Sequence, residues 1–174
     1  MSNQIATLYG VNAKLGAMLR GGQQTTQYLY DQEAVDSNTE SVEFFVNFGS
    51  KTNIQTNLKE GKLPTGESSV LKELIFVADN PISGTIIANF FIGNQRVLKD
   101  YPIYFAAVVG LDPSPLNLNS GSNFSVRLVT NLVIPPQVTF KLELKCEAGA
   151  FADATIISAS TKGVGVLFNP QTSL

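Results

Sequence analysis

The sequence of 174 residues contains no histidine and no tryptophan, and Cys146 is its only cysteine. Without histidine, a Ser-His-Asp or Cys-His catalytic group cannot form, because each needs an imidazole as the base. A single cysteine excludes the usual zinc ligand sets and any disulfide within the chain. We therefore expect no catalytic residue, no metal site and no cofactor, and we interpret Cys146 as a small buried apolar residue.

Paired carboxylates remain the one catalytic option, since a glycosidase needs only two Asp or Glu side chains at the right separation. The acids of this chain are scattered, and several, such as Asp79, Asp100 and Asp112, follow or precede expected strands. Asp at such positions commonly forms turns, because its carboxylate hydrogen-bonds the local backbone. We therefore expect that the chain is not an enzyme.

Charge is also scarce: Asp, Glu, Lys and Arg make up 15% of the residues, the net charge is -2 and the pI is about 5.1. A chain without basic excess lacks the electrostatic footprint of a nucleic-acid-binding protein. A surface poor in charge and rich in amides loses little solvation when a protein partner covers it. No apolar run approaches the roughly 20 residues of a membrane span, and no signal peptide is evident, so we expect a soluble assembly subunit.

From residue 41 onward, short apolar or alternating segments are separated by Gly, Pro, Asn and Asp. Regularly spaced strands of this kind predict an all-β protein. Unequal connections, including a long excursion at 49–68 and a loop at 111–123, favour Greek-key crossings over a simple meander. We predict a single eight-stranded jelly roll, a two-sheet Greek-key β-sandwich. The expected strands are 42–48, 69–78, 84–93, 101–110, 124–134, 137–146, and 154–160 with 163–168 as a pair or as one strand with a glycine bulge.

The segment 137–146 alternates most regularly. Val138, Phe140, Leu142, Leu144 and Cys146 share one parity and are predicted to face the interior. Thr139, Lys141, Glu143 and Lys145 share the other parity and are predicted to face water or a neighbouring subunit.

The first 40 residues differ in character from the rest. Apolar residues recur at helical spacing, which indicates an arm that is possibly part helical, and the segment 21–35 reads as a flexible joint with a short strand around Tyr28 to Tyr30. The arm could contact a partner or a membrane surface, pack on a neighbour, or fold back locally. We thus divide the chain into an N-terminal arm and joint (1–40) and a jelly-roll β-barrel domain (41–174). The candidate contact residues of the arm are Ile5, Leu8, Lys14, Leu15 and Arg20.

The stretch "FFVNFGSKTNIQTNLKEGKLPTGESSVLKELIFV" (44–77) combines an aromatic-rich strand, a "TNL…GKLP.G" excursion and a "V..I.V" strand. In this it resembles the jelly-roll capsid proteins of tailless icosahedral bacteriophages, many of which enclose a membrane. The resemblance implies a structural coat protein that self-assembles into the virion shell, as major capsid, penton or minor shell protein, after synthesis in the host cytoplasm. It implies self-association, contacts with other capsid proteins and an arm that reaches the internal membrane or a neighbour, with no direct nucleic-acid binding and no small-molecule substrate.

A second hypothesis is a carbohydrate- or receptor-binding jelly-roll module of a viral spike. Sugar rings stack on exposed aromatic side chains, and Tyr101, Tyr104 and Phe151 are the candidates for such a site.

Overall fold

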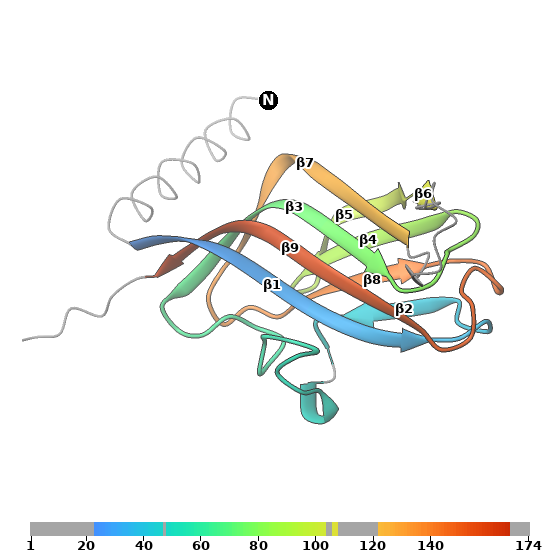
Figure 1. The fold of residues 1–174 in the computed structure, drawn as a ribbon. Coiled ribbons are helices and arrows are strands. Elements are labelled where there is room, and N and C mark those ends of the chain that lie inside the picture. The colour runs from blue at the N-terminus through green and yellow to red at the C-terminus, as the bar shows by residue number, and fades with distance from the viewer. Residues whose placement is uncertain (1–22, 47, 104–105, 108–121, 168–174) are drawn as a thin grey trace, which may run out of the picture.

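The computed structural model describes residues 23–46, 48–103, 106–107 and 122–167 (Figure 1). In these ranges the secondary structure is β, apart from one 3-10 turn, η1 (Phe48–Ser50), and there is no helix long and apolar enough to cross a bilayer. The strands are β1 (Gln23–Val35), β2 (Ser41–Phe44), β3 (Glu67–Ala78), β4 (Ile86–Ile92), β5 (Gln95–Ile103), β6 (Ala106–Ala107), β7 (Ser122–Ile134), β8 (Phe140–Lys145) and β9 (Thr155–Leu167).

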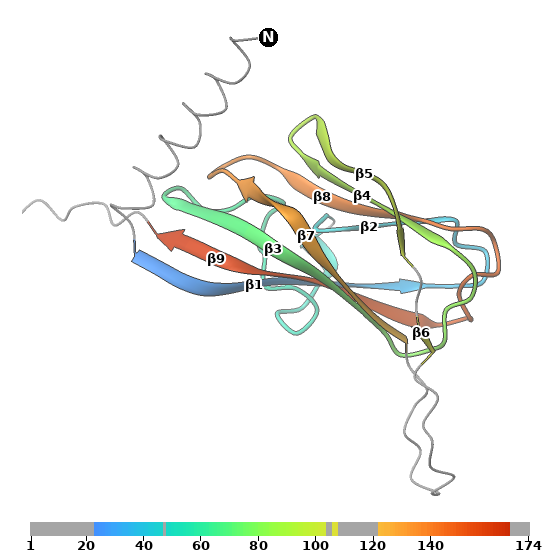
Figure 2. The ribbon, with the colours of Figure 1, turned by 90° about the horizontal axis from the view of Figure 1, so that it is seen from above.

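The strands form two antiparallel sheets stacked on each other (Figure 2). One sheet has the order β1-β9-β3-β7-β6, in which β6 contributes only two residues, and the other has the order β2-β8-β4-β5. The chain crosses between the sheets after almost every strand, so sequence neighbours rarely pair. Such an arrangement of eight long strands is a jelly roll, and the predicted all-β fold is confirmed.

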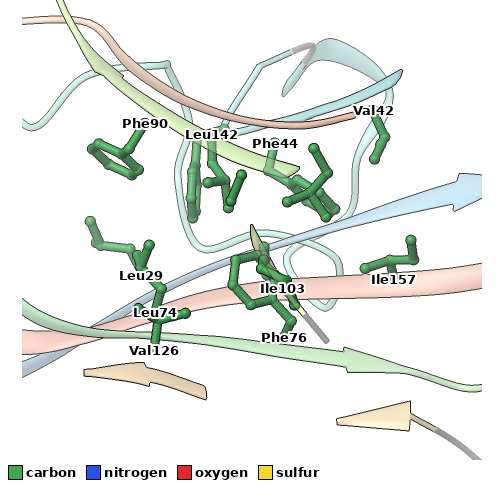
Figure 3. Close-up of a cluster of buried hydrophobic side chains, with 14 of the residues drawn as sticks. Leu29, Val42, Phe44, Leu74, Phe76, Phe90, Ile103, Val126, Leu142 and Ile157 are labelled. Carbon is green, nitrogen blue, oxygen red and sulfur yellow. The ribbon is translucent and has the colours of Figure 1, made fainter. Parts of the chain in front are cut away.

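The core fills the space between the sheets with alternate side chains from both (Figure 3). Phe44, Phe90 and Leu142 of one sheet point toward Leu74 and Phe76 of the other. The ring of Phe140 lies 5.4 Å from that of Phe45 and 6.2 Å from that of Phe90, measured between centroids. Each such buried side chain contributes about 1.5–3 kcal/mol, so the contact between the sheets holds the domain together.

The strand β1 is longer than the sequence predicts. It spans 13 residues and pairs with β9 along its whole length. The expected division at residue 41 therefore leaves out a complete strand of the sandwich. The alternation was hidden because Asp31 and Glu33 share the inward parity with Leu29 and Val35, and acids at such positions read as polar linker.

The strand β5 corrects a second expectation. The sequence predicts strands at 84–93 and 101–110 with a connection between them, but the turn is confined to Gly93 and Asn94, and β5 begins at Gln95. This strand pairs only with β4 and is exposed on both faces except near Leu98 and Ile103. Because most of its side chains are exposed, its sequence carries no apolar alternation, so periodicity could not reveal it.

The C-terminal segment forms one strand, β9, rather than a pair. Its register with β3 shifts between Leu71 and Glu73, so Lys72 is an extra residue that lies opposite no residue of β9. A Cβ atom on Gly163 would lie 2.1 Å from the carbonyl oxygen of Val70. Glycine at 163 thus permits the close approach of β9 to a bulge that belongs to β3.

The strand 137–146 is confirmed in its centre and shorter at its ends. Phe140, Leu142 and Leu144 are buried as predicted. Val138 lies before β8 and Cys146 after it, and both are half-buried. The predicted alternation continues at these ends, where Val138 and Cys146 are less exposed than their neighbours but are not enclosed.

Candidate functional site

The outer face of the four-stranded sheet carries a network of charged side chains. Lys141 of β8 forms an ion pair with Glu43 of β2, and its Nζ lies 5.1 Å from the centre of the Phe91 ring on β4. Lys145 and Glu143 lie 3.6 Å apart on β8. These groups are partly exposed, and ion pairs of this kind each contribute about 0–1 kcal/mol. The face is therefore built to meet water.

Asn89 extends this network toward the sheet edge. Its side chain is fully buried, and its Oδ1 accepts hydrogen bonds from the Asp100 backbone N–H at 2.9 Å and from Arg96 Nη1 at 3.3 Å. Arg96 also pairs with Asp100 at 3.1 Å. The positive φ of 47° at Asp100 turns its N–H toward Asn89. The charged groups at this edge have partners within the chain, which lowers their tendency to recruit another protein.

The outer face of the five-stranded sheet is different, and we call it the five-stranded face. It is formed by the outward side chains of β1, β9, β3 and β7, which lie side by side in front of the other sheet in Figure 1. It carries small hydroxyl and aliphatic side chains on both sides of a charged row that includes Lys162 and Glu73. Val77, Ile156 and Tyr28 are respectively 47%, 45% and 48% exposed. Gln32 Nε2 donates to Ser158 Oγ at 3.0 Å. A sheet face with few charged side chains loses less solvation on being covered than a highly charged one.

On the β1 side of the molecule, charged side chains instead point into the interior. Lys51 Nζ lies 2.8 and 2.7 Å from the two carboxylate oxygens of Asp31, and it also contacts Glu33 and the carbonyl oxygen of Val46. Asp31 is completely buried and the Lys51 side chain is 7% exposed. The ammonium thus contacts four oxygens of three residues, and this pairing lowers the cost of burying its charge and that of Asp31.

This cluster fixes the long connection between β2 and β3. Asp31 Oδ2 accepts the backbone N–H of Phe45 at 2.6 Å, and Phe45 has a φ of 64°, a conformation that a bulky residue seldom adopts. Further along, Asn57 Nδ2 donates to the Tyr28 carbonyl at 2.6 Å and Asn57 Oδ1 accepts the Tyr30 N–H at 3.0 Å. The connection thereby covers part of the open edge of β1, where another strand could otherwise pair.

A hollow of about 650 Å³ lies between β1 and this connection. Leu29, Leu58 and Leu63 line it together with amide and charged side chains, including Lys62 and Glu60, whose charged groups lie 3.2 Å apart. Among the described residues, no three acidic or cysteine side chains converge as a metal site would require. The hollow offers a mixed surface without a cluster of reactive groups.

The residues singled out from the sequence lie in different places. The arm residues Ile5, Leu8, Lys14, Leu15 and Arg20 lie outside the described residues, as does Tyr104. Phe151 is 2% exposed and belongs to the core, so it offers no surface for a sugar ring, while Tyr101 on β5 is 37% exposed. The described structure therefore brings none of the proposed stacking residues together.

Cys146 packs against the core and its Sγ donates to the Thr39 carbonyl oxygen at 3.2 Å. Burial, with a smaller contribution from the negative charge of Glu40, raises the pKa of this thiol. A raised pKa keeps the thiol neutral and weakly nucleophilic. This agrees with its interpretation as a packing residue, although it is half-buried rather than enclosed.

Sequence reasoning missed the five-stranded face as a unit. Its signal was present in the outward parity of two strands, where Ser158 and Ser160 of β9 alternate with inward residues and Ile75 and Val77 of β3 do the same. Only the register shows that these serines lie beside these aliphatic residues.

Comparison with protein-family models and with curated proteins gives no match for this chain.

Proposed function

We propose that this chain is a structural shell subunit, a single-jelly-roll coat protein of a tailless icosahedral virus. The observation that carries the proposal is the contrast between the two outer faces of the sandwich. One face is covered by paired charges that suit water, and the other presents mainly small hydroxyl and aliphatic side chains around a single charged row, which suits a protein neighbour. A subunit that works by packing against copies of itself needs such a face, and it needs no catalytic group.

The resemblance of residues 44–77 to phage capsid proteins supports the proposal independently of the faces. On this proposal the partners are other copies of the chain and other capsid proteins, with the arm (Ile5, Leu8, Lys14, Leu15 and Arg20) contacting a neighbour or an internal membrane. Neither a nucleic acid nor a small-molecule substrate is part of it.

The test is mass spectrometry of purified virus particles that carry this gene, with the copy number of the chain measured relative to the other particle proteins. We expect the chain in the intact shell, and its copy number separates a major capsid protein from a penton or minor shell protein. The proposal would be contradicted if infected cells contain the chain but the particles purified from them do not.

The second candidate, a carbohydrate- or receptor-binding module of a spike, rests on the exposure of Tyr101 alone. It predicts binding to a glycan array that is lost in Tyr101→Ala. The substitution of buried Phe151 is not a test of this candidate, because it would disturb the core.

A further inference from the structure

The register of the five-stranded sheet arranges the outward side chains of the five-stranded face in rows that run across β1, β9, β3 and β7. Residues that pair across neighbouring strands lie in one row, and their side chains stand on the same face. Each row is written in the strand order β1, β9, β3, β7, and the third row is given for the first three strands. The rows are Tyr28, Lys162, Glu73 and Arg127; Tyr30, Ser160, Ile75 and Ser125; Gln32, Ser158 and Val77; and Thr26, Val164, Val70 and Val133.

The charged residues of these rows are confined to one row near the middle of the face. Lys162 lies next to Glu73, and Glu73 lies next to Arg127. Within the chain, Lys162 Nζ and Glu73 Oε2 are 4.0 Å apart, and half of the Lys162 side chain remains exposed. These two charges therefore make only a loose contact with each other and can accept further partners.

We propose that two copies of this chain pair through their five-stranded faces, around a two-fold axis that runs parallel to the strands between β9 and β3. The inference deepens the proposed function, because it names the surface through which a shell subunit would pair. A rotation about this axis places β9 of one copy opposite β3 of the other, and β1 opposite β7, while every row stays at its own level.

The middle row is complementary to itself under this rotation. Lys162 comes to face the partner's Glu73, and Glu73 faces the partner's Lys162. At the ends of the row, Tyr28 faces the partner's Arg127, an arrangement in which a guanidinium can stack on an aromatic ring. One charged row thus supplies two ion pairs and two cation–π contacts, all between copies.

The neighbouring rows are complementary in size. Ile75 comes to face the partner's Ser160, and Val77 faces the partner's Ser158. On the other side of the charged row, Val70 is already buried within its own chain, so the row of Val164 and Val70 adds little to the contact between copies. Large side chains thus meet small ones, as between two sheets that pack about 10 Å apart.

The four-stranded face fails the same operation. An axis between β8 and β4 would set Lys145 against the partner's Ile87 and Lys141 against the partner's Phe91, and Glu143 against the partner's Asn89. Each contact would remove a charge from water without giving it an opposite charge. The self-complementary pattern is therefore a property of the five-stranded face and does not follow from β-sheet geometry in general.

The size of the face is sufficient. Four strands about 4.8 Å apart, followed over eight residues at about 3.3 Å each, cover on the order of 500 Å² per copy. A pair then buries on the order of 1,000 Å², which lies at the lower bound for a specific interface.

The test uses the full chain and two single charge reversals, Lys162→Glu and Glu73→Lys, followed by analytical ultracentrifugation and native mass spectrometry. We expect the wild-type chain to dimerise, and each variant alone to dimerise about 100-fold more weakly, because both inter-copy pairs become like-charged. When the two variants are mixed, every inter-copy pair is again of opposite sign. We therefore expect the mixture to form heterodimers with near wild-type affinity.

The mixing step isolates the contact between copies, because neither variant regains the Lys162 to Glu73 contact within its own chain. Lys145→Glu on the four-stranded face is the matched control, and it should dimerise as the wild type does. A monomeric wild-type chain, variants that dimerise unchanged, or a mixture that stays monomeric would each overturn the inference. Dimers formed by a chain that is absent from virus particles would leave the inference standing and contradict the proposed function.

Discussion

The two sheets of this sandwich treat charge in opposite ways. On the four-stranded sheet, Lys141, Glu43 and their neighbours stand on the outer face, where each ion pair is partly exposed. Near the β1 edge of the five-stranded sheet, Asp31 and Lys51 are buried, and the outer face keeps one charged row. The same residue types thus form a buried ion cluster near the β1 edge and a hydrated outer surface on the four-stranded sheet.

The few charged residues of the chain are therefore distributed unevenly between its two outer faces and its interior. A protein that needed only solubility would distribute its charges over both faces. Outside its one charged row, the five-stranded face carries hydroxyl, aliphatic and aromatic groups, so it is the face on which a protein neighbour would cost less in desolvation. Four predictions test this difference between the two sheets, from the largest expected effect to the smallest.

The largest effect is expected at the buried ion cluster. Asp31→Ala breaks the buried ion pair with Lys51 and leaves the buried Phe45 N–H without its acceptor, and we expect it to lower the free energy of unfolding by about 3–5 kcal/mol. Glu43→Ala, which breaks an exposed pair, should cost about 0–1 kcal/mol. Urea denaturation followed by intrinsic tyrosine fluorescence or circular dichroism measures both. Equal losses in the two variants would show that the buried and exposed networks do not differ.

The second effect is expected at Gly163, which lies between Lys162 and Val164 on β9. Gly163→Ala would drive a Cβ into the Val70 carbonyl, so β9 must shift away from β3. We expect a loss of about 2–4 kcal/mol, in the range of overpacking and backbone strain. Thermal unfolding measures it. Gly49→Ala is the matched control, because a Cβ there meets no atom within 4 Å and its φ is not positive.

The third prediction compares one substitution on the two faces. Ile75→Lys and Ile87→Lys each place a lysine on an outward, half-buried aliphatic position, on the five-stranded and four-stranded sheets respectively. We expect Ile75→Lys to weaken self-association about 100-fold, because the new ammonium has no acceptor in the interface, and Ile87→Lys to change it by less than about threefold. Sedimentation velocity over a concentration series measures both. Equal effects of the two substitutions on self-association would contradict the difference between the two faces.

The smallest effect concerns Cys146, which follows β8 at the end of the four-stranded sheet. Its raised pKa means that less thiolate is present in the folded than in the unfolded chain at pH 8. Any stability that this group contributes is present below its unfolded pKa of about 8.5 and is lost as the pH rises through the higher folded value. We expect a thiol reagent to react several-fold more slowly with the native chain than with the denatured one. A native rate equal to the denatured rate would contradict this, and Cys146→Ala gives the blank.

Sequence patterns predicted the fold class and the centres of most strands, because alternation is a direct record of which side chains face the core. They failed where that record was altered. Asp31 occupies an inward position that ordinarily holds an apolar residue, so β1 was read as part of a joint. The exposed strand β5 has no buried face, so it left no alternation at all.

The candidate site could be predicted less well, because a surface is defined by register. Ser158 and Ser160 look like ordinary outward residues of β9, and only their pairing with Val77 and Ile75 shows the alternation of small and large side chains across the strands. Likewise, Asp31 and Lys51 are 20 positions apart, and no spacing rule for strands brings them together. Long-range pairing had to be seen before either pattern could be recognised.

The extra residue Lys72 indicates where relatives of this chain could tolerate an insertion or a deletion. On either side of it, β3 pairs with β9 without interruption, so a chain lacking this one residue would keep the other β3 side chains on their present sides of that ladder. Insertions and deletions are usually confined to loops, but here the middle of a strand can gain or lose a residue without such a change. When sequences of relatives are aligned with this one, we expect a gap at position 72 in some of them, and residues larger than glycine at position 163 in those same sequences.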